Sequence, residues 1–214
     1  MGSTEEGTVI RKIAWGVMTV LALFIGLYAI ALLFVPAMRA PFLRDRFIVM
    51  PVATFLHLAG AAVALAVGPL QLNARLRNRF LGAHRWMGRS YVAGVLLGGF
   101  GALTMATIAQ AGLPARVGFG LLAVLWLTAT GMAYRHIRGG DQPAHRRWMI
   151  RSYALTFAAV TLRIYVPLSQ VYGIPFEPAY QTIAWLCWVP NLIVAEWLIL
   201  RQPAPAPVAE AAHC

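Results

Sequence analysis

Apolar residues in this chain form long uninterrupted blocks, and polar residues collect in short stretches between them. A block of about 20 apolar residues is long enough to cross a hydrocarbon layer of about 30 Å as a helix. Lipid offers the backbone no hydrogen-bond partners, so such blocks favour helices. We therefore predict an all-α membrane protein, a bundle of six transmembrane helices. The predicted spans are 13–36, 48–70, 87–109, 115–134, 149–170 and 179–200.

Three segments follow from this pattern. Residues 1–12 form a predicted cytoplasmic N-terminal segment, 13–200 form the transmembrane domain, and 201–214 form a disordered tail rich in Ala and Pro. The first apolar block is longer than the core of a signal peptide and no A-x-A site follows it, so we expect a retained helix.

Composition agrees with a membrane protein and explains the charge. The chain is 60% hydrophobic and 12% charged, whereas soluble domains carry about 25% charged residues. A net charge of +11 would suggest nucleic acid in a soluble protein. Here the basic residues separate apolar blocks, so membrane topology explains them and no nucleic-acid partner is expected.

Ten of the eighteen basic residues lie in the second and fourth connections between spans. They are Arg75, Arg77, Arg79, Arg85 and Arg89, and Arg135, Arg138, Arg146, Arg147 and Arg151. Both connections lie on one side of a six-span bundle, and basic loops favour the cytoplasm. This pattern predicts that both termini are cytoplasmic.

A short basic and aromatic motif occurs twice, as "AHRWMGRSY" (83–91) and "AHRRWMIRSY" (144–153). We call each copy the cassette. Each copy lies at the predicted cytoplasmic start of an odd-numbered span. Residues 48–109 and 115–170 therefore resemble two similar helical hairpins in a parallel repeat.

The cassette has one structural interpretation and one chemical one. Its arginines satisfy the positive-inside rule, and Trp86 and Trp148 suit an aromatic belt, which would leave His84 and His145 as interface residues. Two helix N-termini rich in arginine would also attract an anion, either a lipid phosphate of the cytoplasmic leaflet or the carboxylates of a cofactor.

The paired histidines raise a haem hypothesis. A b-type haem in a helical bundle needs two neutral imidazoles at one depth, and His84 and His145 both begin helices on the same side. They would be the axial iron ligands. The arginines that would hold the propionates are Arg85, Arg89, Arg146 and Arg151.

A second candidate pocket contains His57 and Arg163. They lie roughly 13 Å and 10 Å below the outer edge, at about 1.5 Å per helical residue, so both belong to the outer half of the bundle. A quinone or another small redox partner would meet the protein there. The simpler alternatives are an interhelical hydrogen bond for His57 and snorkelling for Arg163. His136, at the inner end of the fourth span, is at a different depth from His57.

The remaining residues of interest give little indication of a chemical function. Gly94, Gly98, Gly99 and Gly101 suit close helix packing, and Glu196 is interpreted as an interface residue. The two cysteines have no metal-site or disulfide spacing. The chain has no GxSxG, HExxH or phosphate-binding loop motif, so hydrolase chemistry has no support.

Three stretches resemble the bacterial predicted membrane proteins grouped as domain of unknown function 2306. They are "HLAGAAVALAVGPLQL" (57–72), "HRWMGRSY" (84–91) and "HRRWMIRSYALTFAAVTLRIY" (145–165). The resemblance covers about 48–200 and implies a multi-pass protein of a bacterial inner membrane. It implies no activity, because none is assigned to that family.

A looser resemblance is to six-helix cytochromes of the b561 type, which carry histidines on the second to fifth helices. His84 with His145 resembles one of their haem ligand pairs, whereas His57 and His136 depart from the other.

Three functions therefore stand open. The first is a haem protein acting in transmembrane or membrane-surface electron transfer. The second is a cofactor-free bundle that binds lipid or a small molecule, or an accessory subunit of a membrane complex. The third is a small transporter, which we place lower because Pro167 and Pro190 lie near span ends and predict no clear pair of broken helices.

Overall fold

The structure is a computed structural model that describes residues 2–201, and its regular elements within that range are all helical. The helices are α1 (Gly2–Phe34), the short 3-10 helix η1 (Pro36–Met38), α2 (Pro41–Val49), α3 (Pro51–Leu72), α4 (Ala74–Arg79), α5 (Leu81–Ala106), α6 (Gly112–Arg138), α7 (Gln142–Thr156), α8 (Ala158–Val171), α9 (Phe176–Leu186) and α10 (Val189–Leu200). Residues 2–11 of the predicted N-terminal segment belong to α1, and the candidate span within this helix is Lys12–Phe34. The predicted Ala/Pro-rich tail lies outside the described residues except for Arg201.

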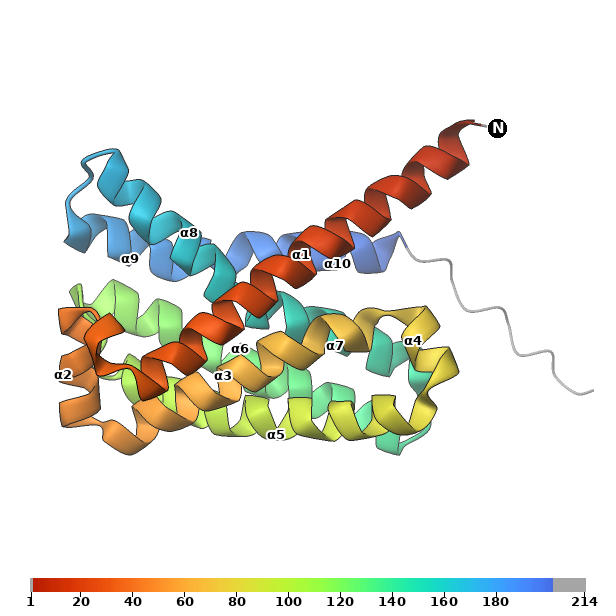
Figure 1. Ribbon diagram of the computed structural model, residues 1–214, viewed down its shortest axis with the longest axis horizontal. Coiled ribbons are helices and arrows are strands. Elements are labelled where there is room, and N and C mark those ends of the chain that lie inside the picture. The colour runs from red at the N-terminus through yellow and green to blue at the C-terminus, as the bar shows by residue number, and fades with distance from the viewer. Residues whose placement is uncertain (1, 202–214) are drawn as a thin grey trace, which may run out of the picture.

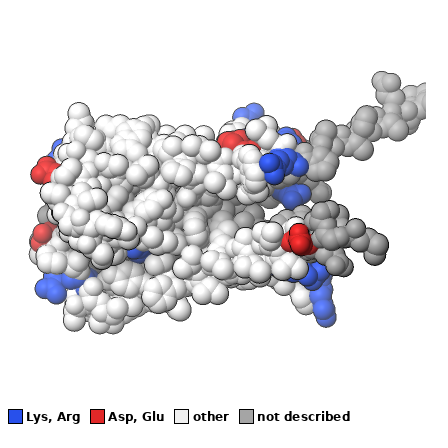
Figure 2. Space-filling model, turned by 90° about the horizontal axis from the view of Figure 1, so that it is seen from above, with Lys and Arg blue, Asp and Glu red and all other residues white. Residues whose placement is uncertain are grey.

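The long helices lie side by side and define two ends of the molecule (Figure 1). The arginine-rich end contains α4, the α6–α7 connection and both cassettes. The far end contains α2 and the α8–α9 connection. Figure 2 shows charged side chains gathered at the two ends of the visible face, with a wide uncharged middle. This distribution suits a protein whose middle is surrounded by hydrocarbon.

The prediction of an all-helical multi-pass membrane protein is confirmed. Within the described residues five segments are long and apolar enough to cross a membrane: Lys12–Phe34, Pro51–Leu72, Gly112–Arg138, Gln142–Val171 and Phe176–Leu200. Helix α5 is 26 residues long but is not among them. Its first turns carry the polar cassette and its apolar part contains four glycines, which lowers its hydropathy.

The second predicted span begins later than expected, because a separate helix precedes it. Proline disfavours helical backbone in the residue before it, and Met50, before Pro51, has φ −139° and ψ 63°. The chain therefore turns at Met50. The nine residues of α2, which begin at Pro41, form a short helix across the far end (Figure 1).

The last two predicted spans each contain one short irregularity in the helix, and both are still long and apolar enough to cross a membrane. The fifth predicted span is interrupted at Phe157, between α7 and α8, and the sixth at Cys187 and Trp188, between α9 and α10. Pro190 lacks a backbone N–H and cannot continue the helical bonding of α9. At the other break the Thr156 hydroxyl donates to Ser152 O at 3.0 Å, a back-bond of the kind that often bends helices.

Glycines allow α3 and α5 to pack with their backbones in close contact. These two helices share the most extensive contact in the bundle. A Cβ at Gly101 would lie 2.5 Å from Ala53 O and 2.8 Å from the His57 backbone nitrogen. Gly60, Gly94 and Gly98 also meet across this crossing. The packing role predicted for the α5 glycines agrees with this geometry, and the crossing brings α5 against His57.

We expect Gly101→Ala to lower the free energy of unfolding by about 1–3 kcal/mol, because an added methyl overpacks a filled contact. Gly131→Ala is the matched control, since a Cβ there would meet nothing within 4 Å. Thermal unfolding of both variants in detergent checks this. Equal melting temperatures for the two variants would refute the close crossing.

Candidate functional site

A cavity of about 180 Å³ lies between the middle of the bundle and the far end. Seven helices, α2, α3 and α5 to α9, contribute to its wall, so it lies where the whole fold converges. Its lining is mostly apolar, with Arg46, His57, Thr156, Arg163 and Tyr180 as the chief polar contributions. We call this space the central cavity.

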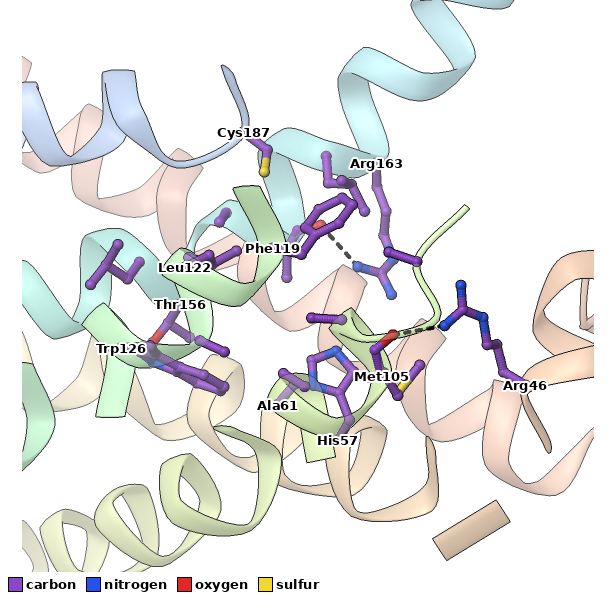
Figure 3. Close-up of a pocket in the computed structure, with 18 of the residues that line it drawn as sticks. Arg46, His57, Ala61, Met105, Phe119, Leu122, Trp126, Thr156, Arg163 and Cys187 are labelled. Carbon is purple, nitrogen blue, oxygen red and sulfur yellow. Dashed lines mark hydrogen bonds between the residues drawn. The ribbon is translucent and has the colours of Figure 1, made fainter. Parts of the chain in front are cut away.

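The central cavity has a cationic end and an apolar end (Figure 3). Arg46, Arg163 and His57 lie at one end together with Met105, whereas Trp126 and Leu122 lie at the other. The structure therefore brings His57 and Arg163 to the same space. It adds Arg46, which is only 9% exposed although it belongs to the short helix α2.

His57 is oriented by the α3–α5 crossing. Its Nδ1 lies 3.0 Å from the carbonyl oxygen of Gly98, and because a carbonyl can only accept, Nδ1 carries the proton. In a neutral imidazole this leaves Nε2 as a hydrogen-bond acceptor. Gly98 is close enough to α3 for this bond because it has no side chain.

Both arginines use little of their hydrogen-bonding capacity. Arg46 donates from Nη1 to Met105 O at 2.9 Å, and Arg163 donates from Nη1 to Ala159 O at 3.0 Å. A guanidinium has five N–H donors. Neither arginine is paired with a carboxylate among residues 2–201, where the ion pairs found are His136–Asp141 and Arg151–Glu196.

Both helix breaks open onto the central cavity. Leu155, Thr156 and Ala158, which flank the break at Phe157, line it, and so does Cys187 at the break between α9 and α10. In membrane proteins irregular backbone is tolerated where it is buried in protein or lines a cavity. Paired interruptions of this kind occur around binding sites in transporters.

A network of buried hydroxyls connects the apolar end of the central cavity to the middle of the bundle. Trp126 Nε1 donates to Thr156 Oγ1 at 2.8 Å, and the Tyr91 hydroxyl bonds with Thr156 Oγ1 and Ser152 Oγ, each at 2.8 Å. Thr130 Oγ1 completes the group, 2.7 Å from Ser152 Oγ. The network ties α5, α6 and α7 together.

The cassette histidines lie at the arginine-rich end, and neither of them lines the central cavity. His145 Nδ1 lies 2.8 Å from Ala133 O and therefore donates, leaving Nε2 free. His84 Nδ1 is buried and has no hydrogen-bond partner. Burial lowers the pKa of His84, and the charges of Arg77 and His145 lower it further, so this imidazole is held in its neutral form.

The cassette arginines predicted to hold propionates have different roles. Arg151 forms a bidentate pair with Glu196, with distances of 2.6 and 2.8 Å, so Glu196 joins α10 to α7. Arg89 lies over Trp86 and Arg151 lies over Trp148, with the guanidinium carbon 4.9 and 4.7 Å from the ring centres.

The three other candidates at this end face outwards or pair locally. Arg85 and Arg146 are exposed. His136 Nδ1 lies 3.3 Å from Asp141 Oδ2. The structure therefore separates His136 from His57, which belongs to the central cavity.

The cassette histidines supply the donors that the haem hypothesis requires. His84 and His145 offer ring nitrogens of the required kind, and the neighbouring arginines Arg85 and Arg146 are unpaired with carboxylates among the described residues. Haem binding therefore stays a prediction.

Sequence reasoning missed Arg46, Tyr180, Trp126 and Thr156 as members of the central cavity. Arg46 lies in the connection between the first two predicted spans, where the sequence predicts no site. The signal that would have found it is the pair Pro41 and Pro51, which brackets a nine-residue helix. The remaining three lie inside apolar blocks, and no spacing rule distinguishes them there.

Comparison with known proteins identifies the family. Residues 54–199 match the family described as "Predicted membrane protein (DUF2306)". The match covers more than half of the chain, so this protein belongs to that family. No curated protein and no solved structure matches the chain significantly.

Two tyrosines of the cassette make a matched test of the hydroxyl network. Tyr91→Phe removes a hydroxyl with two partners, and we expect it to cost about 1–2 kcal/mol of unfolding free energy. Tyr153 is also buried but its hydroxyl has no partner, so Tyr153→Phe should be neutral or stabilising. Thermal unfolding in detergent measures both. A larger loss for Tyr153→Phe than for Tyr91→Phe would contradict the network.

Proposed function

We propose that this protein is an integral membrane protein that binds a small molecule in the central cavity. The observation that carries the proposal is the convergence of two helix breaks on one cavity that also contains two arginines and a histidine. Ionisable residues in membrane-spanning segments almost always face the bundle interior or a cavity, and they mark binding or transport sites. Arg46 and Arg163 face the central cavity in this way.

The size of the central cavity indicates what kind of molecule it would hold. Its volume is about 180 Å³, and a cavity of about 150 Å³ is enough to hold benzene. A ligand with one ring, or an aliphatic body of similar size, therefore suits it. Such a ligand would place its apolar part near Trp126 and Leu122 and its polar part near Arg46, Arg163 and the acceptor Nε2 of His57.

The membrane arrangement we propose has six spans, with α5 as the additional one. Helix α5 packs along α3 for most of its length, so a membrane that contains α3 would contain α5 as well. The pairs α3–α5 and α6–α7 would be the two hairpins of the repeat. We place the arginine-rich end in the cytoplasm of a bacterial cell, with both termini and anionic lipid headgroups on that side.

Cavity filling tests the binding proposal. Ala102 lines the central cavity, whereas Ala93, on the same helix, is exposed and does not. We expect benzyl alcohol or benzoate to raise the melting temperature of the wild-type protein in detergent. Ala102→Phe should weaken this effect about tenfold in apparent affinity, the equivalent of about 1.4 kcal/mol. Ala93→Phe should leave it unchanged.

Ala93→Phe is the control for probes that dissolve in the detergent micelle. Because both variants add the same ring, any difference between them comes from the central cavity. If neither probe stabilises the wild-type protein, or if both variants respond alike, the central cavity is not a binding site.

Transport of the bound molecule is a second candidate function. The two broken helices favour it, since transporters place substrates where discontinuous helices meet. The same pair of variants, reconstituted in liposomes, separates binding from transport: a transporter would show probe uptake with Ala93→Phe and not with Ala102→Phe.

Haem binding stays a prediction, supported by the free ring nitrogens of His84 and His145. Reduced-minus-oxidised spectra of the protein expressed with ample haem should show a Soret band and an α band if it binds haem. His84→Ala and His145→Ala should each abolish those bands, whereas His136→Ala should retain them. Absence of both bands in the wild-type protein would eliminate the hypothesis.

A further inference from the structure

We infer that the ligand of the central cavity is a small organic anion, a monocarboxylate with an apolar body about the size of one ring. This inference rests on the proposed function and adds the chemical class of the ligand. It follows from the charge at one end of the cavity, the groups available to balance that charge, and the apolar surface at the other end.

The cationic end carries charge that the described protein does not balance. Arg46 and Arg163 come from different helices, α2 and α8, and Figure 3 shows both guanidinium groups directed towards the same end of the cavity. Their hydrogen bonds go to neutral carbonyl groups, Met105 O and Ala159 O. A carbonyl satisfies one donor but does not cancel a charge.

Other neighbours do not supply the missing negative charge. Arg163 lies over the ring of Tyr28, but at 5.7 Å from its centre this is a weak attraction. Arg116 adds another positive group at this end, since it donates to the cavity-lining residue Ala109 at 3.4 Å. No carboxylate within residues 2–201 pairs with any of the three arginines.

An unbalanced charge away from water is costly, and the usual compensation is an opposite charge with hydrogen bonds. A carboxylate matches a guanidinium with two parallel N–H···O bonds. Each of the two arginines has further N–H donors for such bonds. The cavity therefore favours a carboxylate over a neutral carbonyl or hydroxyl group of the same size.

The apolar end of the central cavity makes a bare inorganic anion a poorer ligand than an anion with an apolar body. Leu122 and Trp126 line the end of the cavity away from the arginines (Figure 3), and an inorganic ion would leave this apolar surface without contact. A carboxylate attached to a ring or a short branched chain would meet both ends at once.

Binding of matched probes to the full-length protein in detergent tests the inference. Benzoate and benzamide have the same ring and nearly the same shape, but only benzoate is charged. We expect benzoate to bind about tenfold more tightly or better, because its charged hydrogen bonds are roughly twice as strong as neutral ones. Isothermal calorimetry at constant ionic strength measures both.

Substitution of the arginines assigns the preference to them. Arg163→Gln should reduce benzoate affinity about tenfold and leave benzamide affinity unchanged, whereas Arg163→Lys should retain part of the preference because it keeps the charge. Arg46→Gln should act in the same direction. Arg44→Gln is the control, since Arg44 is exposed and bonds to Arg39 O.

The outcomes separate the inference from the proposed function. Equal binding of benzoate and benzamide, or an unchanged preference in both Arg163→Gln and Arg46→Gln, would overturn the anion and leave the binding cavity in place. Stabilisation by inorganic phosphate equal to that by benzoate would overturn the apolar body. Failure of every probe would overturn both. If Arg163→Gln does not fold, Arg163→Lys and Arg46→Gln decide the question.

Discussion

Inside a membrane every polar group of this protein must find its partner within the protein, and the fold follows from that constraint. Its helices satisfy the hydrogen-bonding groups of their own backbones. The two helix interruptions, at Phe157 and at Cys187 and Trp188, lie beside the central cavity. The hydroxyl groups around Tyr91 bond to one another, and Arg151 is matched by Glu196. Against this background Arg46 and Arg163 stand out, because they meet the requirement only in part. The site proposed for this protein lies around these two guanidinium groups, whose hydrogen bonds go to backbone carbonyl oxygens.

Hydrophobic patterning predicted the helical membrane architecture because block length depends on the membrane alone. It could not predict the breaks at Phe157 and Cys187, since these depend on a hydroxyl back-bond and on how a proline near a span end is packed. The sequence placed His57 and Arg163 at similar depth, which is a one-dimensional property. The sequence did not identify Arg46 as a cavity residue, because its position depends on α2 folding across the far end. A tertiary contact of that kind leaves no local signal in the sequence.

The two copies of the cassette have similar sequences but different surroundings. Tyr91 belongs to a hydrogen-bond network, whereas Tyr153 is packed against Gly68 with its hydroxyl unpartnered. Arg151 has a carboxylate partner, and no ion pair is found for Arg89 among residues 2–201. The similarity of the two sequences therefore does not imply similar roles for their residues. The two copies share helix-start geometry and tryptophan stacking, and each copy acquires its remaining contacts from the helices beside it.

The position of Arg46 has a consequence for the wider family. The family match begins at residue 54, so His57 and Arg163 lie inside the shared region while Arg46 lies before it. The residues of α2 that line the central cavity lie outside the matched region. Its other lining residues lie inside that region. Under the binding function proposed above, the nine residues of α2 would thus supply one wall of the site from a part of the chain that the family match does not include.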